Sequence, residues 1–261
     1  MGTIILSILG VIVIFGVVTF IILKFLKPQR TGSVKSIGAS IKEGIKVDFY
    51  PLESYVDGIP DLPPDNPIRK GFEDGRQARD KGNQNEAIGI FRKLLPGSED
   101  SQKVALLNHI GICFYSQGKP DKALGSYKES LKLAEEIQEK DGIVVNLNNI
   151  GIIYYDKDSD SAIRNFNKAI ELDPNYAIAF YNRGLVYGKN RGDYDSAIRD
   201  FKEAIKLAPN FAIAMANMGL AYKGKRDKEN ARQWWEKALG KKEYLPDGGE
   251  KVRQWLKELE E

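Results

Sequence analysis

The chain has few of the residues on which most catalytic and metal sites depend. Its 261 residues include one cysteine and one histidine. A single cysteine excludes a disulfide within the chain, and a single histidine excludes the paired-histidine motifs of zinc enzymes. It also has no glycine-rich phosphate loop, dinucleotide fingerprint or nucleophile elbow. We therefore expect no enzymatic activity, no catalytic residues, no metal site, no cofactor and no small-molecule substrate.

The chain also lacks an excess of charge of either sign. Its 39 lysines and arginines face 36 acidic residues, which gives a net charge of +3. The basic residues are scattered among the acids along the sequence. A nucleic-acid-binding domain instead gathers its basic residues into a patch or stripe. We expect no nucleic-acid partner.

One acidic cluster has the outline of a calcium loop. Residues 156–160 read DKDSD, but glycine is missing from the sixth loop position and glutamate from the twelfth. Calcium loops of this type need the glycine for a sharp turn and the glutamate as a bidentate ligand. We interpret this segment as a solvated turn between helices.

What the chain does have is a fivefold repeat. A glycine is followed about twelve residues later by an alanine, and then by an aromatic residue four positions on. The glycines, 33 to 40 residues apart, are Gly75, Gly111, Gly151, Gly184 and Gly219. The aromatics are Phe91, Tyr127, Phe166, Phe201 and Trp235. A period in this range predicts a helical solenoid, with small residues where two helices cross and the aromatic filling the gap to the next unit.

This pattern resembles the tetratricopeptide repeat (TPR), a helix–turn–helix of about 34 residues whose second helix is often followed by proline. The resemblance implies an all-α fold, a right-handed TPR superhelix of about five repeats over residues 68–245. We place the repeats at 68–103, 104–143, 144–176, 177–211 and 212–245. The second unit is long, and we expect its extra residues, LKLAEEIQEKDG, to lengthen the second helix.

The C-terminal residues 246–261 predict one more amphipathic helix. Val252, Trp255, Leu256 and Leu259 follow the i, i+3, i+4, i+7 spacing of one helix face. We interpret it as a capping helix that covers the last repeat, in preference to a separate helix for partner binding.

The N-terminal residues 3–23 contain no charge, and as a helix they would span about 30 Å, the thickness of a bilayer core. A cleaved signal peptide would have a basic start and a shorter apolar core. We therefore expect a single transmembrane helix that acts as a signal anchor. Lys24, Lys27, Arg30 and Lys35 follow the span, so the positive-inside rule predicts a single-pass protein of the cell membrane with the TPR domain on the cytoplasmic side.

Residues 24–67 link this span to the repeats. Prolines punctuate the segment at positions 28, 51, 60, 63, 64 and 67. Such punctuation is typical of a linker. We expect a tether without a fold of its own.

The partner site predicted from the resemblance is the concave TPR groove, which the first helix of each repeat lines. Asparagine recurs there two residues before the glycine, and an amide can pair with the main chain of an extended peptide. The candidate groove residues are Asn108, His109, Tyr115, Asn148, Asn149, Tyr155, Tyr181, Asn182 and Asn217. The alternative is that asparagine at this position steadies helix packing, with the partner bound on the convex face or by the tether.

The predicted function is a membrane-anchored scaffold or adaptor that binds a partner protein or extended peptide and assembles or localises a membrane-associated complex. The basic carboxylate clamp of chaperone-binding TPRs is absent, since Val145 and Asn149 occupy matching positions in the third repeat. Two alternatives remain open: a regulatory subunit of an enzyme or secretion complex, and an outward-facing envelope assembly factor.

Overall fold

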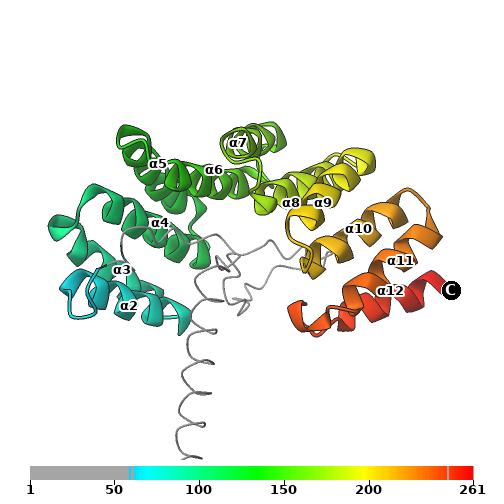
Figure 1. Ribbon diagram of the computed structural model, residues 1–261, viewed down its shortest axis with the longest axis horizontal. Coiled ribbons are helices and arrows are strands. Elements are labelled where there is room, and N and C mark those ends of the chain that lie inside the picture. The colour runs from blue at the N-terminus through cyan, green and yellow to red at the C-terminus, as the bar shows by residue number, and fades with distance from the viewer. Residues whose placement is uncertain (1–58, 60–61, 246, 261) are drawn as a thin grey trace, which may run out of the picture. The chain divides into compact units, whose positions relative to one another are not determined.

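The computed structural model describes residues 59, 62–245 and 247–260, all of which belong to the compact unit Ser36–Glu261. This part of the chain forms eleven α-helices and no strand (Figure 1). The first six are α2 (Pro67–Asp80), α3 (Gln84–Leu94), α4 (Asp100–Ser116), α5 (Pro120–Glu136), α6 (Lys140–Tyr154) and α7 (Ser159–Leu172). The others are α8 (Ala177–Leu185), α9 (Tyr194–Leu207), α10 (Ala212–Gly224), α11 (Lys228–Leu239) and α12 (Glu250–Glu260).

The helices pack as consecutive pairs in chain order, from α2 with α3 to α10 with α11 (Figure 1). In three of these pairs the second helix has an aspartate N-cap. Asp158, Asp193 and Asp227 stand just before α7, α9 and α11, and each side chain accepts a hydrogen bond from a backbone N–H of the first turn. An aspartate at this position satisfies donors that the helix itself leaves open. The all-α TPR superhelix expected from the repeat is confirmed.

Each of the five glycines of the repeat pattern lies under the aromatic ring of its own repeat. A Cβ built on Gly111 would lie 2.4 Å from Cε1 of Tyr127, and one built on Gly219 would lie 2.3 Å from Nε1 of Trp235. Both rings are fully buried. This corrects one detail of the sequence analysis, because the ring packs onto the glycine inside the repeat and does not serve only to fill the gap to the next one.

The two irregular repeats accommodate their extra residues differently. α5 has 17 residues against 14 in α7 and α9, but it ends at Glu136, and the last letters of the expected extension already belong to α6. The segment after α8 has one residue more than the corresponding segment of the other repeats. It forms a π-helical turn over Val186–Asn190. A π turn absorbs one inserted residue without ending the helix.

The C-terminal helix α12 covers the last pair. Val252 and Leu259 are buried, and the rings of Trp255 and Trp235 lie with their centroids 5.7 Å apart. Because Trp235 belongs to α11, the amphipathic face that the sequence predicted is turned onto the final repeat.

The predicted membrane location has to be corrected. The span expected at 3–23 and the tether up to residue 58 lie outside the described residues. Across the described residues, no helix combines the length and the apolar character needed to cross a membrane. On this finding the prediction of a single-pass cell-membrane protein, with its repeats on the cytoplasmic side, is wrong.

Candidate protein-interaction surface

The predicted groove residues are distributed over four first helices of the pairs. α4 carries Asn108, His109 and Tyr115, α6 carries Asn148 and Asn149, and α8 and α10 carry Tyr181, Asn182 and Asn217, with Tyr155 directly after α6. All are buried except Tyr115, which is partly exposed. The exposed fraction is 0% for Asn149 and Asn182 and 9% for Asn217.

Several of these side chains pair with one another across neighbouring repeats. Asn182 Nδ2 donates to Asn148 Oδ1 at 2.9 Å, which joins α8 to α6. Asn217 Nδ2 donates to the Tyr181 hydroxyl at 3.1 Å, which joins α10 to α8. In a buried environment such bonds fix the position of one helix against the next. This row of buried side chains, Asn148, Tyr181, Asn182 and Asn217, therefore connects neighbouring repeats of the solenoid.

A residue that the sequence analysis missed extends the row toward the N-terminus. Asn146 accepts a hydrogen bond from Asn108 Nδ2 at 3.2 Å and donates to Ser130 Oγ and to the Gly142 carbonyl, both at 2.8 Å. Ser130 in turn donates to the Val104 carbonyl at 2.8 Å. A signal was present in the sequence, because Asn146 interrupts the apolar run of α6 without belonging to the repeat pattern.

These contacts support the packing interpretation of the asparagines. An amide that already bonds a neighbouring helix has fewer groups left for a peptide. Partner binding by Asn149, Asn182 and Asn217 stays a prediction, and the structure gives this row a role in joining repeats.

His109 has a distinct environment at the start of the row. Its Nδ1 lies 2.7 Å from Nη1 of Arg79, and its ring meets the ring of Phe72 edge to face at a centroid distance of 4.8 Å. Because a guanidinium only donates, Nδ1 accepts and the ring proton resides on Nε2. Burial, followed by the charges of Arg79 and Arg76, holds the pKa of His109 well below its usual 6.5.

This environment predicts acid sensitivity of folding. In the unfolded chain the histidine takes up a proton below pH 6.5, whereas in the folded chain it stays neutral. Stability is therefore fully present above pH 6.5 and falls below it by about 1.4 kcal/mol per pH unit until the folded pKa is reached. Because the chain has only one histidine, His109→Gln should remove this slope in urea titrations between pH 7 and 5. An unchanged slope in that variant would place the acid sensitivity elsewhere.

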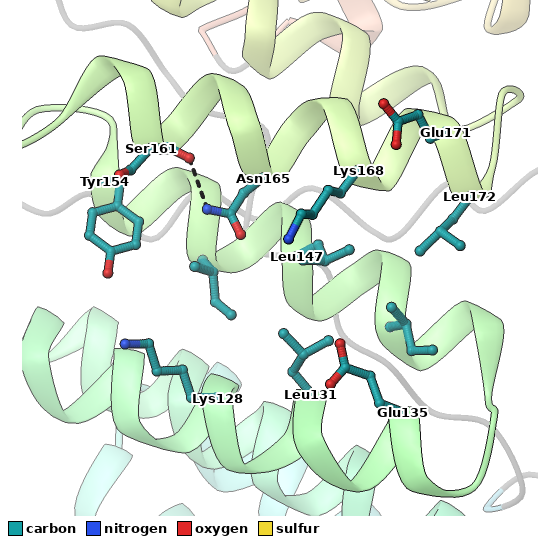
Figure 2. A pocket seen from close by; sticks show the side chains of 12 residues that line it. Lys128, Leu131, Glu135, Leu147, Tyr154, Ser161, Asn165, Lys168, Glu171 and Leu172 are labelled. Atoms are coloured by element: carbon teal, nitrogen blue, oxygen red, sulfur yellow. Dashed lines mark hydrogen bonds between the residues drawn. The ribbon is translucent and has the colours of Figure 1, made fainter.

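An open groove lies on another surface, between α5 and α7 (Figure 2). Its volume is about 550 Å³. The floor comes from α6, with Ile143, Leu147, Ile150 and Tyr154. The α5 wall carries Lys128, Leu131 and Glu135, and the α7 wall carries Ser161, Asn165, Lys168, Glu171 and Leu172. We call this feature the α5–α7 groove.

A second, smaller groove of about 440 Å³ lies on the opposite flank of α5. Leu95, Pro96 and Leu107 give it an apolar lining, and Glu129, Lys132 and Glu136 line it from α5. α5 therefore forms a ridge with a groove on each side. Neither groove is among the sites predicted from the sequence.

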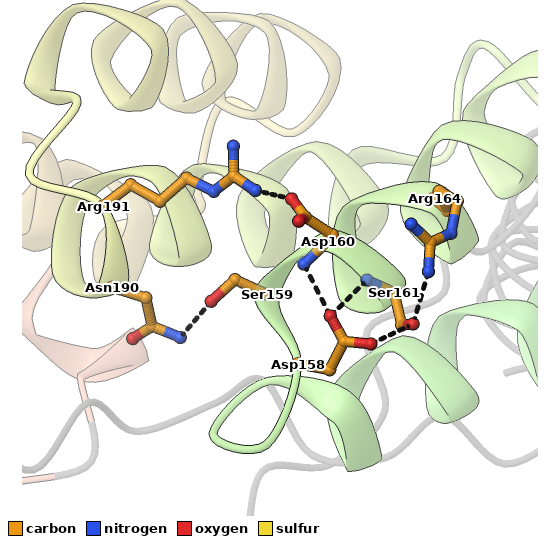
Figure 3. Close-up of polar contacts among 7 residues, drawn as sticks. All are labelled: Asp158, Ser159, Asp160, Ser161, Arg164, Asn190 and Arg191. Atoms are coloured by element: carbon orange, nitrogen blue, oxygen red, sulfur yellow. Dashed lines mark hydrogen bonds and ion pairs between the residues drawn. The ribbon is translucent and has the colours of Figure 1, made fainter.

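The acidic cluster at 156–160 is occupied by structural contacts (Figure 3). Asp158 accepts from the backbone N–H groups of Asp160 and Ser161, and its pKa is lowered, chiefly by the hydroxyl of Ser161. Asp160 pairs with Arg191 from the turn after α8. Within the described ranges, no three acidic, histidine or cysteine side chains come together as a metal site would require. The segment works as a helix cap and a link between repeats.

Family models give the identity of the repeat. Three family models of the tetratricopeptide repeat match residues 102–175, 177–211 and 212–240, which together make up more than half of the chain. The chain belongs to the TPR family. The α5–α7 groove thus lies between the second helices of two neighbouring TPRs.

The comparisons also give relatives of this TPR chain. Photosystem I assembly protein Ycf3 of Acaryochloris marina is 29% identical over 126 residues, which cover 48% of this chain and 67% of that protein. Ycf3 of Synechococcus sp. (strain CC9605) is 33% identical over 101 residues, covering 38% and 57%. The chain thus spans between about half and two thirds of these relatives.

Among solved structures, a crystal structure of MamA is 31% identical with a TM-score of 0.50, over 65% of this chain and 94% of that one. The structure of a MamA RS-1 double mutant has a TM-score of 0.54 at 16% identity, over 69% and 97%, and shows likeness of fold alone.

Proposed function

We propose that this TPR chain is a non-catalytic scaffold that binds a partner protein and helps to assemble a multi-subunit complex. The observation that carries the proposal is the α5–α7 groove, an open apolar trough bordered by charged side chains on the TPR surface. Solenoids of this kind present extended surfaces to other proteins. The likeness to Ycf3, which is named as a photosystem I assembly protein, supports assembly as the purpose of binding.

The buried amide row contributes to this function indirectly. By joining α4, α6, α8 and α10 it holds successive repeats in a fixed relation. A partner that contacts more than one repeat then meets a preorganised surface and does not have to order it on binding.

The proposal predicts the outcome of capture from the cells that make the protein. We expect the tagged full chain, after mild cross-linking, to recover several subunits of one complex together. Removal of the chain should leave those subunits unassembled on native gels. A Gly111→Leu variant, which disrupts the helix crossing of the second TPR, serves as the control and should lose the recovery.

Two results would contradict the scaffold proposal. One is recovery that does not exceed that of the tag alone, with native gels unchanged in cells that lack the chain. The other is equal recovery by the Gly111→Leu chain, since binding would then not depend on a folded solenoid.

A further inference from the structure

We propose that the α5–α7 groove binds an amphipathic α-helix of the partner protein, oriented by acidic residues at one end and basic residues at the other. This inference rests on the scaffold function proposed above and names the chemistry of the partner. Three observations support it: the spacing of the apolar residues on the groove floor, the backbone groups of the groove, which are already hydrogen-bonded within helices, and the wall charges that lack an ion-pair partner among the described residues.

The floor has the spacing of a helix-packing seam. Ile143, Leu147, Ile150 and Tyr154 follow one another at intervals of four, three and four residues along α6. The same alternation places apolar side chains along the seam of a coiled coil. Leu147 and Ile150 are buried and close the bottom of the groove, whereas Ile143 and Tyr154 keep partly exposed apolar surface for an incoming helix. Leu172, with 38% of its surface exposed, extends the apolar lining on the α7 wall.

The backbone of the groove favours a helix over an extended peptide. All three sides are α-helices, whose N–H and C=O groups bond within the helix along their length. An extended peptide would find no main-chain partner there, whereas a helix satisfies its own backbone and needs only side-chain contacts. The one amide side chain of the lining, Asn165, already donates to the Ser161 carbonyl at 2.8 Å (Figure 2).

The walls carry charges that are available to a partner. Lys128, Glu135, Lys168 and Glu171 are exposed, and none has an ion-pair partner in the part of the chain that the structure describes. Elsewhere on the described surface many charges are paired, as in Lys157 with Asp121 and Lys223 with Glu258. The four wall charges are therefore free to pair across an interface.

These charges are also sorted along the groove. Glu135 and Glu171 lie toward the ends of α5 and α7, whereas Lys128 lies two turns earlier on α5 and Lys168 one turn earlier on α7 (Figure 2). A partner helix with acids facing the lysines and bases facing the glutamates complements both ends. Sorting of this kind sets orientation and rejects partners with the opposite pattern.

The floor also fixes the length of the partner segment. Tyr154 follows Ile143 by eleven positions along α6, or about 16 Å at 1.5 Å per residue. A helix of about three turns fills this distance. The expected segment has apolar residues at i, i+3, i+4 and i+7, glutamates toward one end and lysines toward the other.

The test uses the full chain and two synthetic helical peptides with this apolar stripe. The first peptide carries glutamates in one half and lysines in the other, and the second carries lysines in both halves. We expect fluorescence anisotropy to show saturable binding of the first peptide, weakened at least tenfold by Lys128→Glu with Lys168→Glu. The same double variant should bind the second peptide at least tenfold more tightly than the native chain does.

A matched control separates groove recognition from bulk charge. Lys70 and Lys202 are exposed lysines on α2 and α9, outside the groove lining. Lys70→Glu with Lys202→Glu makes the same change in net charge and should leave both affinities within twofold. Circular dichroism confirms that each variant keeps its helices.

Three outcomes would overturn the proposal: no saturable binding of the first peptide, equal effects of the two double variants, or no gain for the second peptide. If the native chain still captures subunits of a complex, such a result contradicts helix binding in this groove but does not contradict the scaffold function.

Discussion

Alanine in place of Gly111 is expected to destabilise the fold, while alanine in place of Gly125 is expected to stabilise it. The Cβ of the first alanine would lie 2.4 Å from the ring of Tyr127, which is fully buried and has no room to swing away. Overpacking of this kind costs about 1–3 kcal/mol. Nothing lies within 4 Å of a Cβ at Gly125, and alanine in an open helix position gains about 0.5–1 kcal/mol over glycine.

Urea unfolding of the two variants measures the difference directly. Both changes add one methyl group inside an α-helix, so helix propensity cancels from the comparison and the ring contact remains. A second variant confirms the cause: Tyr127→Leu should reduce the penalty at Gly111, because the smaller side chain leaves space for the new Cβ. Equal stability of the alanine variants at 111 and 125 would show that Tyr127 does not restrict that position.

The glycines could be predicted from the sequence because size alone determines what fits at a helix crossing. Gly151 and Phe166 are opposite extremes of side-chain volume. The recurrence of such a pair in every repeat indicates a close helix contact, even before the contacting atoms are known. The period gave the helix pairs, and the apolar spacing at Val252 and Leu259 gave the capping helix. What the period could not give was the direction in which each ring leans.

The polar residues were harder to predict because a side chain's position on a helix does not determine what covers it. Asn149 and Asn182 share the position that the resemblance places in the groove, yet both are buried, and Asn182 donates to Asn148 of the preceding repeat. An amide suits a buried contact between helices as well as it suits a peptide. Only the packing of neighbouring repeats distinguishes these roles.

The α5–α7 groove was missed for a related reason. Lys128 and Glu171 look like ordinary surface charges in the sequence, since most charges on a helix face are solvated. The floor and the two walls come from residues up to 44 positions apart in the sequence, and nothing local indicates that they form one groove. The signal in the sequence was the spacing of four, three and four residues between the apolar side chains on one face of α6.

An ion pair between α8 and α9 is also invisible to the repeat pattern. Arg183 holds Asp200 with two parallel bonds, Nε to Oδ2 at 2.8 Å and Nη2 to Oδ1 at 2.7 Å. Its third nitrogen, Nη1, donates to Asn167 of α7 at 2.6 Å. The Asp200 side chain is 8% exposed, so one arginine links three helices around a buried carboxylate.

Replacing Arg183 by methionine is therefore expected to be among the most destabilising single changes in the chain. It leaves the Asp200 carboxylate buried without its counter-charge, which costs about 3–5 kcal/mol in comparable pairs. The exposed pair of Lys157 with Asp121 is the matched control, and Lys157→Met should cost no more than about 1 kcal/mol. Urea unfolding at pH 7 measures both variants.

The loss in Arg183→Met should also depend on pH and on the partner residue. Burial already raises the pKa of Asp200 above its usual 3.8 in the native chain, although Arg183 opposes the shift. Without the arginine the folded carboxyl takes up a proton more readily than the unfolded one, so the deficit should shrink as pH falls from 7 toward 4. Arg183→Met combined with Asp200→Leu should recover most of the loss at pH 7, because an apolar pair leaves no buried charge uncompensated. A deficit that is the same at pH 7 and pH 5, and that persists in the double variant, would mean that Arg183 stabilises the repeats through its packing on Phe180 and not through Asp200.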